Sequence, residues 1–465
     1  GLASGCNNTE GNDNVFLGSF AGSNNNGNRN IFLGFKAGLC NKNSNDNCYI
    51  GTYAGYSNAE GKDNVSFGNS AGESMATGDY NVMLGHEVAK ESIGMYDNVV
   101  IGHQAGFRNS AHDNVFIGTK AGFLGISGSC NVYLGYHSGS NNAGTNNIFL
   151  GTKSGVLRNE YLSSIDMYQY GDCNIFLGNE AGYSFKMGDR NIILGSRTTL
   201  RQGDKNIIIG DEVSSSNTEN SVIIGQGILN NYSKNSVLIG QGIQDGGSNS
   251  ILIGFETKHT GETSTLIGSK ITDEGNSNII IGVNNSNTGS NSIYIGENRD
   301  YISTGDFNIS IGREAGAAAS GSNNLFLGYQ SGFSNDTGNN NVFLGLQAGM
   351  SNNGNENVML GINSGLEAKG HRNVLLGFNS GFKSKAEDSI FIGTNAGISN
   401  SGQRNVSVGN RSGQKMEDDY NVAIGTRASE NMTKGTATVS IGYKAGQWNN
   451  GSHNVSIGYE SGLRI

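Results

Sequence analysis

A short phrase recurs along the whole chain and limits the folds that are open to it: an asparagine, three mainly apolar residues and a glycine. Its first copy is residues 14–18 (Asn-Val-Phe-Leu-Gly), and Ser-Phe-Ala-Gly follows. With one longer gap, the closing glycine returns every 16 or 17 residues up to Gly195. The spacing then tightens to 14 or 15 residues as far as Gly296, and lengthens again to 16 or 17 up to Gly458. Such self-similarity indicates a repeat architecture.

The phrase itself predicts a β-strand that ends in a turn. Side chains alternate between the two faces of a strand, and the glycine allows the chain to bend after it. The 74 glycines disfavour helices, and the absence of proline suits a chain whose backbone N–H groups pair in ladders. We therefore predict an all-β β-solenoid of about 28 coils of 14–17 residues, each with two short strands. The asparagine that opens the phrase is expected to stack into a ladder, with serine in its place in several short-period coils.

The period divides the array into three zones of one continuous rod. They are residues 1–195, with long-period coils and an inserted loop at 156–173, residues 196–296, with 14–15-residue coils, and residues 297–465, with long-period coils. Because both ends fall inside a repeat, we expect a processed or partial chain.

The two faces of the strand predict an assembly. Val15 and Leu17 share one face, which we expect to pack in the core of the coil itself. Phe16 points to the opposite face, and most copies carry a large apolar residue at this middle position. A long apolar stripe marks an association site, so we expect these side chains to meet a neighbouring copy in a homo-oligomer. The residues expected at that contact are Phe16, Phe32, Phe116, Phe149, Phe176, Phe326 and Phe343.

The short-period copies at residues 220–225 (Asn-Ser-Val-Ile-Ile-Gly) and 235–240 (Asn-Ser-Val-Leu-Ile-Gly) resemble the head repeat of trimeric autotransporter adhesins. That resemblance implies a trimer and a left-handed parallel β-roll with about fourteen residues per coil. The flanking Asn-Val-Phe-Leu-Gly-x-x-Ala-Gly copies resemble repeats of phage tail fibres and other surface fibres. The longer period of the flanks departs from the adhesin pattern.

Aromatic residues that break the regular pattern are candidate receptor contacts. Insertions in repeats form loops on one face, often the binding face, and tyrosine is enriched at interfaces. The candidates are Tyr161, Tyr168 and Tyr170 in the inserted loop, Tyr301 in a smaller excursion, and the single tryptophan, Trp448. The alternative is a loop that folds back over the rod or against the next chain.

Two sequence features raise the question of a metal. His86 and His103 occupy the same column of consecutive coils, about 4.8 Å apart, and are candidates for a metal site. The alternative is a pair of solvated histidines, because no carboxylate partner is evident.

A second motif, Gly-Asp-x-Asn, recurs before strands, as at residues 78–81. Its stacked aspartates could bind Ca²⁺. The alternative is a turn in which the aspartate caps its own backbone. We expect no metal and no cofactor.

Charge and residue types exclude several functions. The net charge is −9 without a basic run, which disfavours nucleic acid, and the apolar runs are too short for a membrane span. No catalytic constellation is found, and the clustered carboxylates of a carbohydrate-cleaving β-helix enzyme are not evident, so we expect no enzyme.

We expect a structural, adhesive fibre segment located outside the cell, on a cell surface, a virion fibre or a secreted filament. Its expected partners are copies of itself, also end to end, and a glycan or protein of a host surface. The alternatives are a ligand-binding solenoid for glycan or ice, and a tail-fibre shaft with receptor-binding loops.

Overall fold

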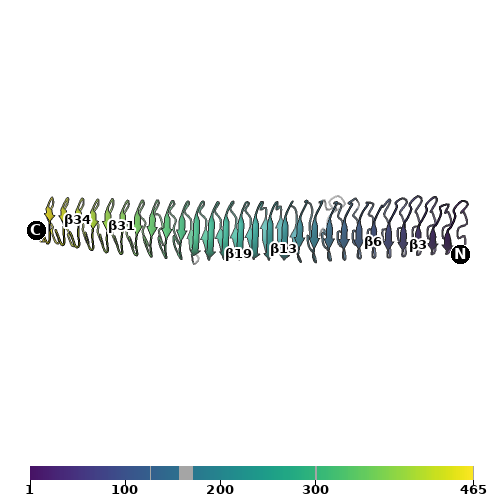
Figure 1. Cartoon of the computed structure of the whole chain (residues 1–465), viewed down its shortest axis with the longest axis horizontal. Coiled ribbons are helices and arrows are strands. Elements are labelled where there is room, and N and C mark those ends of the chain that lie inside the picture. Colours follow the sequence, from purple (N-terminus) through teal and green to yellow (C-terminus); the bar gives the residue numbers. More distant parts are fainter. Residues whose placement is uncertain (126, 157–170, 299–300, 464–465) are drawn as a thin grey trace. The chain divides into compact units, whose positions relative to one another are not determined.

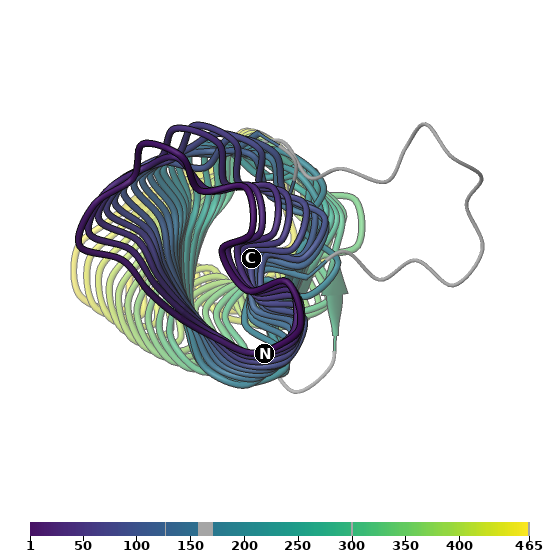
Figure 2. The ribbon, with the colours of Figure 1, turned by 90° about the vertical axis from the view of Figure 1, so that its right-hand side faces the viewer.

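The computed structural model describes residues 1–125, 127–156, 171–298 and 301–463, whose regular elements are all β-strands. The chain divides into two compact units, Gly1–Ile243 and Gln244–Ile465. Both are parallel β-solenoids, with about 27 turns in total, so the all-β solenoid prediction is confirmed. Within each unit, consecutive strands lie side by side (Figure 1) and the coils overlie one another along the stack (Figure 2). No helix that could cross a membrane occurs in the described part of the chain.

Each unit has one long sheet, with one strand from each coil. In the first unit these strands are β1 (Val15–Leu17), β2 (Ile31–Leu33), β3 (Cys48–Ile50), β4 (Val65–Phe67), β5 (Val82–Leu84), β6 (Val99–Ile101), β7 (Val115–Ile117), β8 (Val132–Leu134), β9 (Ile148–Leu150), β10 (Ile175–Leu177), β11 (Ile192–Leu194), β13 (Ile207–Asp211), β15 (Val222–Gln226) and β17 (Val237–Gln241). In the second unit they are β19 (Ile251–Phe255), β21 (Thr265–Ser269), β23 (Ile279–Val283), β25 (Ile293–Glu297), β27 (Ile309–Ile311), β28 (Leu325–Leu327), β29 (Val342–Leu344), β30 (Val358–Leu360), β31 (Val374–Leu376), β32 (Ile390–Ile392), β33 (Val406–Val408), β34 (Val422–Ile424), β35 (Val439–Ile441) and β36 (Val455–Ile457).

Among the described residues, a second strand per coil occurs in the short-period coils and in the 16-residue coil that follows them. In the first unit these strands are β12 (Thr199–Leu200), β14 (Ser214–Ser216) and β16 (Leu229–Asn231); in the second they are β18 (Gln244–Asp245), β20 (Lys258–His259), β22 (Thr272–Asp273), β24 (Ser286–Asn287) and β26 (Ile302–Ser303). The other described long-period coils have one strand, so the expectation of two strands in every coil is wrong. Their Gly-x-x-Ala-Gly segment forms turns instead, with the Ala21 N–H donating to the Gly18 carbonyl at 3.3 Å.

The large middle residue of each long-sheet strand points into the core of its own coil. Equivalent residues pair in register, Phe16 with Phe32 and Phe32 with Tyr49. Phe32 and Tyr49 are fully buried within the single chain, and their rings stack at 5.0 Å. The expected orientation is therefore reversed, because this face is lined by small residues that leave room for a ring. The Cβ of an alanine in place of Gly38 would lie 2.6 Å from the Phe32 ring.

The assignment of the middle phenylalanines to an inter-chain contact is wrong for the same reason. Of the expected contact residues, those fully buried in the chain itself are Phe32, Phe116, Phe149, Phe176, Phe326 and Phe343. Phe16, in the first strand, is partly buried and stacks on Phe32 at 5.3 Å. Buried in their own core, these rings are not available to a neighbour.

The outer face of the sheet carries the aliphatic residues that were expected inside. Val15 and Leu17 are 54% and 67% exposed. The pattern continues through the second unit, where Val358, Leu360 and Ile362 are exposed on one coil. The long sheet therefore presents two columns of mainly aliphatic side chains to its surroundings.

The asparagine that opens the phrase forms a buried ladder that ties each coil to the next. The Asn64 side-chain oxygen accepts from the Asn81 N–H at 3.0 Å, and its amide nitrogen donates to the Gly78 carbonyl at 2.7 Å. Asn64 Nδ2 also donates to Asn47 Oδ1 at 3.2 Å. The amide thus satisfies backbone groups that would otherwise be buried without a partner.

Replacing Asn64 by alanine is expected to lower the free energy of unfolding of the surrounding coils by about 1–3 kcal/mol, because the Asn81 N–H and the Gly78 carbonyl lose their partners. Hydrogen exchange of the backbone amides in residues 64–85 measures this loss. Asn64→Ser is the matched control, because serine serves in the same ladder where Ser221 Oγ accepts from the Ser236 N–H at 3.2 Å. Equal effects of the two substitutions would contradict a role for the side-chain acceptor.

Candidate functional site

A groove in the first unit has a volume of about 890 Å³. It crosses several consecutive coils, from the turn at Ser127 to the turn at Lys234. Gly144, Gly171 and Gly188 are among its lining residues, and the next coil's carbonyl oxygen lies within 2.3 Å of where a Cβ would stand on each. Side chains are thus absent where the coils approach closely, and the polar residues beside the glycines line the groove.

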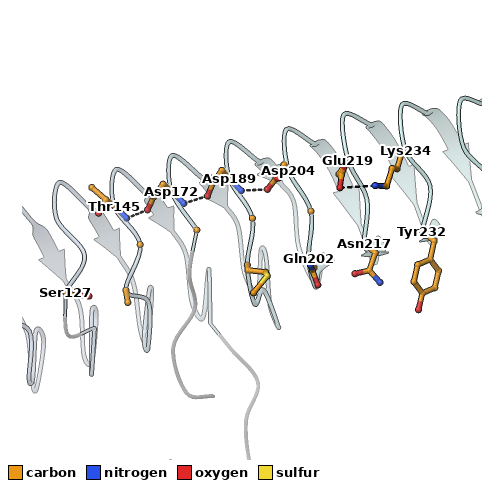
Figure 3. A pocket seen from close by; sticks show the side chains of 16 residues that line it. Ser127, Thr145, Asp172, Asp189, Gln202, Asp204, Asn217, Glu219, Tyr232 and Lys234 are labelled. Atoms are coloured by element: carbon orange, nitrogen blue, oxygen red, sulfur yellow. Dashed lines mark hydrogen bonds and ion pairs between the residues drawn. The ribbon is translucent and has the colours of Figure 1, made fainter. Parts of the chain in front are cut away.

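One row of lining residues is acidic (Figure 3). Asp172 Oδ1 accepts from the Thr145 N–H at 2.6 Å, and Asp189 Oδ1 accepts from the Asp172 N–H at 2.8 Å. Asp204 Oδ1 accepts from the Asp189 N–H at 2.7 Å. Each carboxylate is therefore fixed by the preceding coil, and the row repeats at the coil spacing of about 4.8 Å.

The row continues with an ion pair, and a second row consists of neutral side chains. The Lys234 ammonium lies 3.1 Å from the Glu219 carboxylate. Gln202, Asn217 and Tyr232 lie together in the other row (Figure 3). Tyr232 is 68% exposed. Hydrogen-bonding groups beside an exposed aromatic ring suit a hydroxyl-rich ligand that is bound across several coils.

The acidic row corrects the expectation that no carboxylates cluster in a groove. Glycoside hydrolysis uses two carboxyl groups that flank the scissile bond. Asp172, Asp189 and Asp204 succeed one another along one row (Figure 3), and each has an oxygen bonded to a backbone N–H.

The aromatic residues proposed from sequence lie apart from the groove or outside the described residues. Tyr161, Tyr168 and Tyr170 fall in the segment that the structure does not describe. Tyr301 is exposed and packs edge-on against Phe333, at 5.2 Å between ring centroids. Trp448 is exposed. Neither belongs to the groove of the first unit. Sequence reasoning missed Tyr232, although it stands in the polar segment before a strand.

The two histidines proposed from sequence do lie together. The His86 and His103 rings stack at 5.2 Å, 4° from parallel. Glu87 lies beside them, although no carboxylate partner was evident from the sequence. Hydrogen bonds from Lys90 and then Gln104 lower the pKa of Glu87 to about 2.

The Gly-Asp-x-Asn turns use their aspartate oxygens within the protein. Asp79 Oδ1 accepts from the Lys62 N–H at 2.7 Å, and Asp306 Oδ1 accepts from the Ser290 N–H at 2.7 Å. The positive φ falls on the next residue, 61° at Tyr80 and 56° at Phe307. Because the acceptor is one oxygen, an asparagine can replace the aspartate, as the bond from the Asn12 N–H to Asn28 Oδ1 illustrates. The turn role accounts for the motif without Ca²⁺.

A column of buried ionisable residues in the second unit was not foreseen. Asp245, His259 and Asp273 occupy equivalent positions of three consecutive coils and are almost fully buried. His259 Nδ1 lies 3.0 Å from Asp245 Oδ1, and His259 Nε2 lies 3.8 Å from Asp273 Oδ2. Asp273 Oδ1 accepts from Asn278 and Asn287 at 2.9 Å, while Oδ2 has no hydrogen-bond partner. The sequence did contain a signal: the three residues are spaced 14 residues apart, and each stands shortly before a turn glycine.

Replacing Asp273 by asparagine is expected to stabilise the surrounding coils at neutral pH by about 1 kcal/mol, because the amide removes the charge of a fully buried side chain. Burial raises the pKa of Asp273 above its usual 3.8. The folded state therefore binds the proton more tightly than the unfolded state. Stability contributed by Asp273 is present below the usual pKa and is lost as the pH rises towards the higher folded pKa.

Hydrogen exchange of residues 258–289 between pH 3 and 7 measures this effect. The Asp273→Asn chain should lose the part of the pH dependence that Asp273 causes, whereas Asp306→Asn, at an exposed turn, should retain it. A loss of stability in Asp273→Asn at neutral pH would mean instead that the carboxylate stabilises the column as an ion.

Comparison with protein-family models and with curated protein sequences gives no match to this chain. The relation to adhesin heads or fibre repeats therefore stays a prediction, and the function is argued from the residues of the chain itself.

Proposed function

We propose that the chain is a segment of an extracellular adhesive fibre, in which stacked coils act as a stiff spacer and the groove of the first unit binds glycans of a facing surface. The groove carries this proposal, since it combines fixed carboxylates, amides and an exposed tyrosine on consecutive coils. A site that repeats with the coils suits an extended ligand whose own units repeat.

The charge of the groove narrows the class of glycan. Among the described residues of the lining, one is basic, Lys234, and four are acidic: Asp172, Asp189, Asp204 and Glu219. Sulfated or carboxylated sugars would be repelled, while hydroxyl and ammonium groups would find acceptors. The expected ligand is a neutral or amino-substituted oligosaccharide.

Glycan binding by the full chain tests this function. Tyr232→Ala should weaken binding of neutral or amino-substituted oligosaccharides by roughly tenfold if the ring supplies about 1.4 kcal/mol. Tyr80→Ala is the matched control, since Tyr80 is 60% exposed, also has a positive φ and lies outside the groove. Absence of binding, binding that prefers anionic glycans, or equal effects of the two substitutions would overturn the proposal.

The same proposal includes a homotrimer that is formed through the outer face of the long sheet. Its support is the pair of outward columns, in which Val358 and Leu360 stand exposed beside Ile362 of the same coil. Apolar patches beyond roughly 600 Å² on a soluble monomer mark an interaction surface. A second copy presents the same columns with the same spacing. The left-handed β-roll and the kinship with adhesin-head or tail-fibre repeats belong to this proposal through the sequence resemblance alone.

Mass measurement by light scattering tests the assembly and should give three times the mass of the chain. Leu344→Glu combined with Leu360→Glu should shift the protein towards the monomer on dilution, because the carboxylates would be buried in the contact. Thr337→Glu, at an exposed turn of the same region, should leave the trimer intact. A parent chain that is folded but monomeric would contradict the proposed trimer.

A further inference from the structure

A histidine pair and a glutamate come together on the outside of the first unit. β5 and β6 pair in parallel, with Val82 opposite Val99 and Leu84 opposite Ile101. The same register continues beyond the strands, so His86 and His103 stand one above the other on adjacent coils. Both side chains are exposed, and their nearly parallel rings are 5.2 Å apart. Exposed rings can turn about the Cβ–Cγ bond without displacing the core.

The backbone and two hydrogen bonds hold Glu87 beside this pair. Its φ of 54° turns the chain after His86, and its N–H donates to the Asn69 carbonyl at 2.9 Å. Glu87 Oε2 accepts from Gln104 Nε2 at 2.8 Å, and Oε1 lies 2.8 Å from the Lys90 ammonium. The donor atoms of His86, Glu87 and His103 all lie within 4.8 Å of one another.

We propose that His86, Glu87 and His103 bind one divalent transition-metal ion, with Zn²⁺ as the preferred ion. Two imidazole nitrogens and one carboxylate oxygen form a common zinc donor set, at about 2.0–2.2 Å from the ion. The rings turn towards each other to bring their nitrogens from the stacked arrangement to those distances. Three protein ligands leave a coordination position for water or for an oxygen or nitrogen atom of a bound molecule.

The neighbouring charges allow the carboxylate to change partner. Lys90 has a second carboxylate within reach, Glu73 at 3.8 Å, so its ammonium can leave Glu87 without losing all pairing. The Arg108 guanidinium is paired with another carboxylate, that of Glu91 at 2.6 Å, and is therefore not a competing partner for Glu87. The ion would link two adjacent coils through side chains, in addition to their backbone ladder. Ca²⁺ and Mg²⁺ are not expected to compete, because they prefer oxygen ligands.

Titration of the full-length chain with Zn²⁺ and with Co²⁺, after removal of metals by a chelator, tests the site. We expect one Zn²⁺ per chain by calorimetry and visible absorption bands from Co²⁺ bound by nitrogen and oxygen. His86→Asn combined with His103→Asn should abolish saturable binding. Glu87→Gln, which still accepts from Gln104, should weaken it by at least roughly tenfold.

Two controls separate this site from other donors. His112→Asn should leave binding unchanged, since His112 is an exposed histidine outside the cluster whose Nδ1 lies 2.8 Å from the Asp113 carboxylate. The free cysteines would reveal themselves by a sulfur-to-cobalt charge-transfer band in the near ultraviolet. Absence of saturable binding in the parent chain, or binding that the double histidine variant retains, would overturn the proposal.

Discussion

Replacing Phe149 by aspartate is expected to unfold the coils around it rather than to dissociate an assembly of intact chains. Phe149 is fully buried, and its ring stacks between Tyr133 at 5.0 Å and Phe176 at 4.7 Å. A Cβ on Gly155 would lie 2.4 Å from this ring, so glycine and ring fill one space. Alanine should lower the local free energy of unfolding by about 3–5 kcal/mol. Aspartate should lower it further, because its charge would have no partner in the core.

Hydrogen exchange resolved along the chain is the suitable measurement, because repeat proteins can open locally while distant coils stay folded. Protection should fall between residues 132 and 155 in Phe149→Ala, with the coils near residue 31 unaffected. Ile148→Asp is the matched control, since Ile148 is the preceding residue of β9 and points outwards, 37% exposed. It should keep the protection and reduce association. A folded but monomeric Phe149→Asp chain would contradict this result and would support a contact between chains through the middle residues of the strands.

The solenoid could be predicted from the sequence because one repeated phrase determines most of the local structure of a coil. The strand, the closing glycine and the inward asparagine all follow from the repeated Asn-x-x-x-Gly. The inward face could also have been derived from that phrase. Asn30, Phe32 and Gly34 are two residues apart and share one face of the strand. A ladder of asparagine amides that satisfy backbone groups belongs inside, so Phe32 belongs there too.

The groove and the histidine cluster depend on information that the repeat does not contain. Asp172 and Asp189 are separated by an ordinary repeat, but only the fold brings their row opposite Tyr232. Glu87 follows His86 directly in sequence, which in a plain strand would place it on the other face. Its positive φ instead turns the carboxylate towards both rings. A left-handed residue that is not glycine is hard to foresee from sequence, because its cost is offset by tertiary contacts.

Replacing Gly225 by alanine is expected to separate β15 from β17, and its effect should be far larger than that of the same change two residues later. Gly225 has a φ of 150°, and a Cβ would lie 1.7 Å from the Gly240 carbonyl oxygen. That oxygen belongs to the backbone of the paired strand and cannot move without breaking the register of Gly225 with Gly240. Overpacking and backbone strain should each cost about 1–3 kcal/mol.

Gly227→Ala supplies the comparison, because Gly227 has a φ of 60° and no atom within 4 Å of its Cβ position. Strain alone should then cost about 1–2 kcal/mol, a value that the chain tolerates at many other left-handed residues, Tyr232 among them. Hydrogen exchange across residues 207–241 should show lost protection on both strands in Gly225→Ala and only slight loss in Gly227→Ala. Equal losses would mean that the glycine column serves backbone conformation alone. A larger loss in Gly225→Ala than in Gly227→Ala would show that the closing glycines let adjacent coils approach closely. At that distance the parallel strands pair, the asparagine amides bond from coil to coil and the inward side chains pack against one another.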